Sequence, residues 1–164
     1  MDGRWKYLLT LAPLAVVLDQ ASKWLVNETI PLNGGFVVID GFFNLVNIRN
    51  RGAAFGMLNR SDIDWQVWLF LASTIVATAV IITLMRKSGQ APLLWSGLSL
   101  ILGGAFGNLI DRLKERAVTD FLDVYYGTWH WPAFNVADIA ICVGAGLTIL
   151  AMLLGHDRRG LAKD

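Results

Sequence analysis

The stretch Trp65–Met85, WQVWLFLASTIVATAVIITLM, contains no charged side chain over 21 residues. A helix needs about 20 apolar residues to cross the ~30 Å hydrocarbon core of a bilayer. Three further windows are long enough, at about residues 7–26, 93–110 and 133–154. Only 16% of the residues are charged and the mean hydropathy is +0.51, whereas soluble domains average about 25% charged residues. We therefore expect an all-α membrane protein with four transmembrane helices, in a single domain over residues 1–164.

The first window imitates a cleavable signal peptide, because Arg4 and Lys6 precede an apolar run. However, Asp19, Gln20 and Lys23 stand where small residues should form the cleavage site. We therefore expect this window to remain as the first transmembrane helix.

Four spans place both termini on one side of the membrane. The termini and the 86–92 connection carry seven basic residues, whereas the other two loops carry six over about 60 positions. Cytoplasmic loops are the ones enriched in Lys and Arg. The termini are therefore predicted to be cytoplasmic, and the long first loop and the third loop to face outward.

The long outer loop, about residues 31–60, carries a β-strand pattern. Phe36–Ile39 and Phe42–Ile48 are rich in aromatic and β-branched residues, and Gly34-Gly35 and Asp40-Gly41 interrupt them. We expect a small extracytoplasmic β-hairpin or sheet resting on the outer membrane face.

Ionisable residues at membrane depth cost at least about 2.5–3.5 kcal/mol each and are functional candidates by default. Asp138 lies near the start of the fourth window and has no basic residue nearby in sequence. Asp19 and Lys23 are four residues apart, so they can pair on one helix face. For that pair a structural role remains as open as a functional one.

The third loop supplies a partner for Asp138. Val118–Tyr125 holds Asp120 and Asp123 among apolar residues, which is typical of an interfacial loop laid against the membrane. Two adjacent carboxyls share a proton, and such a pair can activate water against an amide. Asp120 and Asp138 are the predicted pair, with neither given a fixed role, and Asp123 is an alternative second acid.

Polar residues are expected around this pair. Gly103 and Gly107 form a small-xxx-small helix face that permits close contact. Asn108 and Arg112 follow at the outer boundary, and Asn135 lies three residues before Asp138 on the same side. A cation and amides beside two carboxyls could orient a peptide backbone or stabilise a developing oxyanion.

These residues alone suit a proton-coupled transporter as well as a peptidase, and a structural scaffold is a third reading. No internal repeat of the transporter kind is visible. Cys142 is the one cysteine and is predicted to be a buried, inert thiol. His130 and His156 lack metal-ligand spacing, so no metal site is expected. No basic run suggests a nucleic-acid partner.

Five short motifs resemble those of bacterial lipoprotein signal peptidases (signal peptidase II) and occur in the same order, so that the match covers nearly the whole chain. They are Asp19–Lys23, Asn50–Phe55, Gly103–Arg112, Val118–Phe121 and Phe134–Asp138.

The resemblance implies an aspartic endopeptidase that removes the signal peptide from prolipoproteins, on the amino side of a diacylglyceryl cysteine. It implies Asp120 and Asp138 as the catalytic pair, inhibition by globomycin, and no metal or cofactor. The positions that match residues lining the family's active site are Asp19, Asn50, Asn108, Arg112 and Asn135.

The expected location is the bacterial inner membrane, with the site near its outer face and membrane lipid around it. A monomer is the default expectation. The Asn50–Phe55 segment and the hairpin are expected to cover the site.

Overall fold

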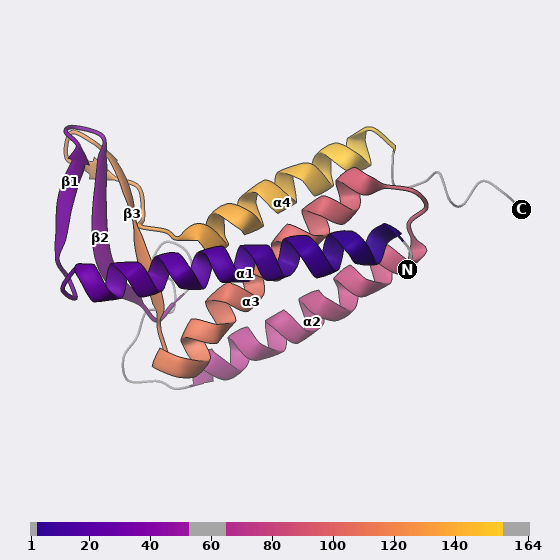
Figure 1. Cartoon of the computed structure of the whole chain (residues 1–164), viewed down its shortest axis with the longest axis horizontal. Helices are drawn as coiled ribbons and strands as arrows, with labels where there is room; N and C mark the ends of the chain where they lie inside the picture. Colours follow the sequence, from indigo (N-terminus) through magenta and orange to yellow (C-terminus); the bar gives the residue numbers. More distant parts are fainter. Residues whose placement is uncertain (1–2, 53–64, 156–164) are drawn as a thin grey trace, which may run out of the picture.

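The structure, a computed structural model, describes residues 3–52 and 65–155. Within these ranges four helices are long and apolar enough to span a membrane: α1 (Gly3–Thr29), α2 (Trp65–Lys87), α3 (Pro92–Glu115) and α4 (Val136–Leu153). They run lengthwise together, and the start of α1 and the end of α4 lie at the same end of the molecule (Figure 1). The prediction of a membrane protein with four spanning helices is confirmed.

Helix α3 forms the centre of the bundle. In its apolar window 61% of the residues are buried, against 11% in α2. A Cβ on Gly103 would lie 2.6 Å from the Ala12 carbonyl oxygen, and one on Gly107 would lie 2.6 Å from the Asp19 carboxylate. The predicted small-residue face therefore exists, and it lets α1 lie directly on α3.

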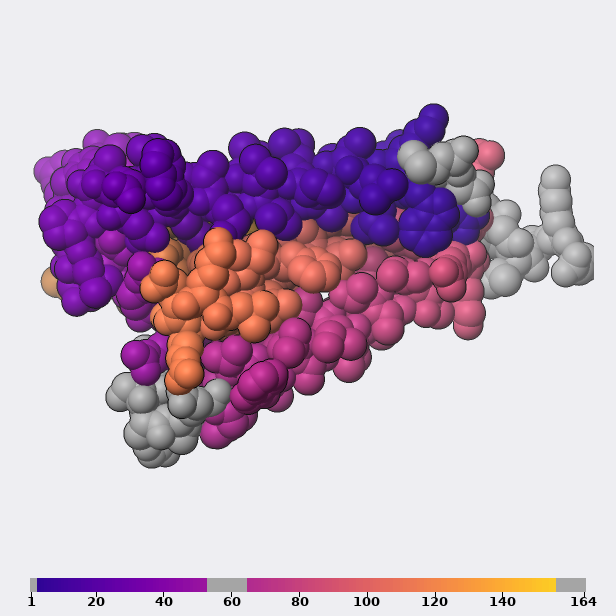
Figure 2. Space-filling model, turned by 60° about the horizontal axis from the view of Figure 1, so that its bottom comes forward, coloured from indigo at the N-terminus to yellow at the C-terminus, as the bar shows by residue number. Residues whose placement is uncertain are grey.

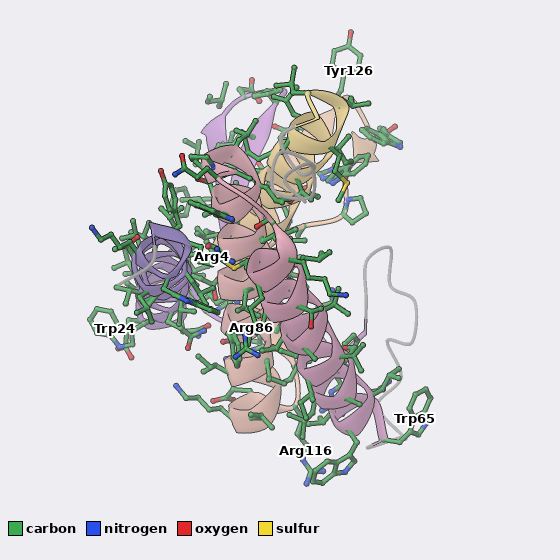
Figure 3. The ribbon with its side chains drawn as sticks, turned by 90° about the vertical axis from the view of Figure 1, so that its right-hand side faces the viewer. Arg4, Trp24, Trp65, Arg86, Arg116 and Tyr126 are labelled. Carbon is green, nitrogen blue, oxygen red and sulfur yellow. The ribbon has the colours of Figure 1, made fainter. Side chains whose placement is uncertain are left out.

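The outer surfaces of the helices are apolar, as contact with lipid requires. Figure 2 shows α1 and α2 diverging toward one end, with the second half of α3 between them. Trp24, Trp65 and Tyr126 project outward from three different elements and are 65%, 48% and 84% exposed (Figure 3). Aromatic side chains at the ends of spans are typical of a membrane interface.

The prediction for Cys142 was wrong, because its side chain is exposed rather than buried. An apolar run in a spanning helix contacts lipid or a cavity as readily as a protein core. Hydrophobicity alone does not distinguish these surroundings.

A four-stranded antiparallel sheet in the order β1-β2-β3-β4 stands at one end of the bundle (Figure 1). The predicted hairpin is confirmed as β1 (Gly35–Ile39) and β2 (Phe43–Asn50). The part of the predicted β-rich loop beyond residue 52, including residues 53–55 of the expected cover, lies outside the described residues.

The third outer loop is not merely interfacial, because its residues form β3 (Val118–Tyr126) and β4 (Trp129–His130). Strand β3 pairs with β2, with Asp120 opposite Ile48. Aspartate is depleted in strands, so Asp120 and Asp123 did not indicate a strand in the sequence. Long-range pairing with β2 stabilises the strand.

Candidate active site

Asp120 enters the site from strand β3. Its carboxyl is 4% exposed and is held by two amides. The Asn50 side chain on β2 donates to Oδ2 at 3.0 Å, and the Asn135 side chain donates to Oδ1 at 2.7 Å. The pairing of β3 with β2 thus brings an amide from one strand onto the acid of the next.

Asp138 enters from the first turn of α4, where Asn135 is the N-cap. The Asn135 Oδ1 accepts from the Asp138 backbone N–H at 3.0 Å, and Asp138 Oδ2 accepts from the Asn135 backbone N–H at 3.2 Å. This reciprocal capping box holds Asp138 at a helix start, where the helix dipole favours negative charge. Asn135 therefore contacts both Asp120 and Asp138, and the Asn-x-x-Asp spacing is the sequence signal for this role.

Asn108, on α3, contacts Asp138 from the other side. Its Nδ2 donates to Asp138 Oδ1 at 2.8 Å. Its Oδ1 accepts from Lys23 Nζ at 2.9 Å and from Asn135 Nδ2 at 3.1 Å. The amide therefore joins α1 and α3 to the acid on α4.

A buried ion cluster lies behind this amide. The predicted pair of Lys23 with Asp19 is present at 2.8 Å, and Lys23 also bridges to Asp111 on α3 at 2.9 Å. The Gln20 side chain donates to Asp111 at 2.7 Å, and Asp19 Oδ1 accepts from the Ala137 backbone N–H at 2.9 Å. Asp19 is fully buried, so here it ties α1 to the start of α4.

A cavity of about 690 Å³ opens beside the two acids. Of the seven predicted site residues, five line it: Asn50, Asn108, Arg112, Asp120 and Asp138. The other two, Asp19 and Asn135, are fully buried behind the wall. Asn135 donates to Asp120, and Asp19 accepts from the backbone N–H of Ala137, the residue before Asp138. The apolar part of the wall includes Trp131, Phe134, Ile139, Ile141, Cys142 and Val143.

Arg112 places a cation at the same cavity. Its guanidinium donates to the Gly52 carbonyl at 3.0 Å and to the Asn108 carbonyl at 3.2 Å, and lies 3.8 Å above the Phe70 ring. Its Nε has no hydrogen-bond partner among the described residues. Arg112 therefore holds Gly52, at the end of the described part of the loop, while its Nε is buried.

The surroundings of Asp120 raise the pKa of its carboxyl to about 6. Burial is the largest cause, and the negative charge of Asp138 adds to it. Hydrogen bonds from Asn50 and Asn135, with the charge of Lys23, act in the opposite direction. Asp120 can therefore hold a proton much closer to neutral pH than an ordinary aspartate.

The alternative acid, Asp123, has different partners. His130 Nδ1 lies 2.9 Å from its Oδ1, and the Asn44 side chain donates to its Oδ2 at 2.8 Å. Positions three apart on a strand face opposite sides of the sheet. Among the described residues Asp123 does not line the cavity that Asp120 lines.

Comparison with known proteins shows which family this chain is similar to. Residues 11–154 match the family model Peptidase_A8, described as signal peptidase (SPase) II. A lipoprotein signal peptidase of Nitratidesulfovibrio vulgaris is 58% identical over 91% of this chain and 90% of its own length. One from Geobacter metallireducens is 44% identical over 100% of this chain and 99% of its own length.

The fold has a solved counterpart, described as a bacterial membrane enzyme and obtained by the in meso method. It superposes with a TM-score of 0.78 at 30% identity, over 95% of this chain and 92% of that one. The family match over most of the chain and the shared fold lead to one conclusion. The chain belongs to the signal peptidase II family.

Proposed function

We propose that this chain is a membrane aspartic endopeptidase that removes signal peptides from bacterial prolipoproteins, cutting on the amino side of a cysteine that bears diacylglycerol. Family membership and the name lipoprotein signal peptidase on its relatives support the substrate class. The observation that carries the chemistry is that Asp120 and Asp138 line one cavity and are both bonded to Asn135.

The proposed reaction uses a water molecule held between the two carboxyls. One carboxylate takes a proton from the water as its oxygen attacks the scissile carbonyl carbon, and the other carboxyl protonates the carbonyl oxygen. The tetrahedral intermediate then collapses, the C–N bond breaks, and the amine leaves protonated. No covalent acyl-enzyme forms in this scheme.

The cavity suits a substrate that is polar at the reacting bond and apolar elsewhere. Asp138 and Cys142 are four residues apart on α4, about 6 Å along the helix axis, and both line the cavity. The wall therefore changes from carboxylate to apolar within about one turn. A volume of about 690 Å³ is within the usual range for ligand sites, about 300–1,000 Å³. This is where the signal helix and the acyl chains would lie.

Arg112 and Asn108 would hold the substrate backbone beside the acids. A guanidinium and an amide at the edge of a poorly hydrated cavity can stabilise negative charge that develops on the carbonyl oxygen. Both side chains line the cavity beside Asp120 and Asp138, which supports this role. No step in this scheme uses a metal or a cofactor.

The proposed location is the bacterial inner membrane, with cytoplasmic termini and the cavity near the outer face. Arg4 donates to the Arg86 carbonyl, and both lie at the end where α1 begins (Figure 3). The sheet, whose strand β3 contains Asp120, lies at the opposite end (Figure 1). The positive-inside rule then orients the molecule. We expect a monomer in contact with membrane lipid and inhibition by globomycin.

The test is cleavage of a prolipoprotein carrying a diacylglyceryl cysteine by purified enzyme in detergent. Asp120→Asn and Asp138→Asn should each reduce cleavage to a low residual rate while remaining folded. Asp123→Asn is the matched control, because Asp123 bonds to the sheet and does not line the described cavity wall. Normal cleavage by both of the first two variants would contradict the proposal.

A further inference from the structure

Lys23 is a buried cation whose hydrogen bond to Asn108 is not explained by ion pairing. It is 3% exposed, and its ammonium group donates to Asp19 at 2.8 Å and to Asn108 at 2.9 Å. It also forms an ion pair with Asp111 at 2.9 Å. A buried ion pair contributes little net stability compared with apolar packing. The bond to Asn108 suggests a different role, because Asn108 touches Asp138.

The contacts of Asn108 determine which way its amide points. Its Oδ1 lies between Lys23 Nζ at 2.9 Å and Asn135 Nδ2 at 3.1 Å, and neither nitrogen can accept a hydrogen bond. The reversed amide would place its NH₂ against an ammonium group and its oxygen against the Asp138 carboxylate. Lys23 and Asn135 therefore oblige Asn108 to present an N–H to Asp138, and Lys23 is the charged member of the two.

The two acids of the pair are consequently not equivalent. Asp138 accepts N–H bonds from Asn108 and Asn135 and lies in the first turn of α4, where negative charge is favoured. Asp120 lies on a strand, without a helix dipole, and is 4% exposed. The charged groups around Asp138 on the elements packed against it are Asp120 on β3, Asp111 and Arg112 on α3, and Asp19 and Lys23 on α1.

We propose that Lys23 is a positioning residue that fixes the Asn108 amide, so that Asp138 is the ionised base of the pair and Asp120 carries the proton. This inference rests on the proposed peptidase function. Asp138 then takes the proton from water as the O–C bond forms, while Asp120 protonates the carbonyl oxygen. On collapse Asp138 returns its proton to the leaving nitrogen, the C–N bond breaks, and Asp120 recovers a proton from the intermediate. Both acids end as they began.

The test must remove the Lys23 bond without leaving an extra buried charge. Lys23 with Asp19 and Asp111 has a net charge of −1, from one cation and two carboxylates. In the double variant Lys23→Met/Asp111→Asn, Asp19 remains and the net charge is again −1. The pH profile of kcat and KM is measured on a diacylglyceryl-cysteine peptide in detergent.

Without Lys23 only the neutral Asn135 Nδ2 still donates to Asn108 Oδ1, so the orientation of the Asn108 amide and its N–H bond to Asp138 are weakened. We expect kcat to fall roughly 10- to 100-fold, the loss typical of one hydrogen bond to a charged group, with KM little changed. The acidic limb of the profile should move upward by about one pH unit. The proposal would be overturned by no loss of rate, or by a loss that is equal at every pH and leaves the acidic limb in place. A purely structural role for Lys23 would lower the rate without shifting the acidic limb.

Gln20→Met is the matched control. Within the described part of the chain, the Gln20 side chain donates to Asp111, Asp19 and the Gly107 carbonyl and does not bond to Asn108. Its acidic limb should stay at the wild-type pH, and a shift equal to that of the double variant would overturn the proposal.

Asn108→Asp provides a second route if the double variant does not fold. It keeps an oxygen for Lys23 but replaces the N–H that faces Asp138 by a second oxygen. A loss and an upward shift of the acidic limb at least as large are expected, because the new carboxylate repels Asp138 in addition to the lost N–H bond. A wild-type profile would overturn the proposal. Wild-type enzyme that leaves the peptide intact would instead contradict the proposed function itself, which distinguishes the two failures.

Discussion

Replacement of Asn135 tests how the site is held together, because one side chain performs two separable tasks there. Its Oδ1 caps α4 through the Asp138 backbone N–H at 3.0 Å, and its Nδ2 donates to Asp120 at 2.7 Å. Alanine removes both tasks. Serine keeps an oxygen at the N-cap and removes the Nδ2 donor, which also bonds to Asn108 Oδ1 at 3.1 Å and to the Thr119 carbonyl at 3.4 Å.

The expected sizes follow from these contacts. Loss of an N-cap costs about 1 kcal/mol, and loss of the donor to the buried Asp120 carboxyl costs about 1–3 kcal/mol. Asn135→Ala should therefore lower the free energy of unfolding by about 2–4 kcal/mol. Asn135→Ser should recover about 1 kcal/mol of that loss, because serine caps as well as asparagine. Both variants should lose roughly 10- to 100-fold in kcat, because neither supplies the donor.

The assays are thermal unfolding in detergent and cleavage of a diacylglyceryl-cysteine peptide under the same conditions. The reasoning would be refuted by an Asn135→Ser enzyme with wild-type kcat, since the Nδ2 contact to Asp120 would then be dispensable. It would equally be refuted if serine recovered no stability relative to alanine, because capping would then not be a task of residue 135.

Three further outcomes are expected. Burial raises the pKa of Asp120 to about 6 from 3.8, so the folded state binds this proton more tightly than the unfolded chain. The free energy of unfolding should then fall by up to about 3 kcal/mol as the pH rises from 3.8 to about 6. Asp120→Asn should abolish this pH dependence in a series of Tm measurements. Gly104→Ala should cost about 1–3 kcal/mol and lower activity, because its Cβ would meet the Ala137 carbonyl, whereas Gly146→Ala meets open space and should lose no stability. Treatment with a metal chelator should leave the cleavage rate unchanged, and a loss restored by a divalent metal would contradict water activation by carboxyls alone.

Local patterns in the sequence were sufficient to predict the spans and the β-hairpin. Apolar runs of the length of a bilayer identified four helices, and the alternation of breakers with β-branched residues identified β1 and β2. These signals are contained within short windows, so no long-range contact is needed to read them. The helices extend beyond the predicted spans at several ends, because polar residues continue a helix outside the hydrocarbon region.

Contacts between segments far apart in the sequence could not be predicted from local patterns. The segment containing Asp120 was expected to be an interfacial loop, and only β2, about 70 residues away, makes it a strand. Lys23 was expected to pair with Asp19, but its bridge to Asp111 depends on how α1 lies on α3. The capping box of Asn135 with Asp138 was missed although its three-residue spacing was available as a signal.

The most direct test of the central claim is the cleavage rate of the double variant Asp120→Asn/Asp138→Asn compared with the two single variants. Two carboxyls that act as one unit lose their function when either is removed. The account predicts that the double variant is no slower than the slower single variant. Losses that multiply in the double variant would show that the two acids act independently, and would contradict a shared-proton pair.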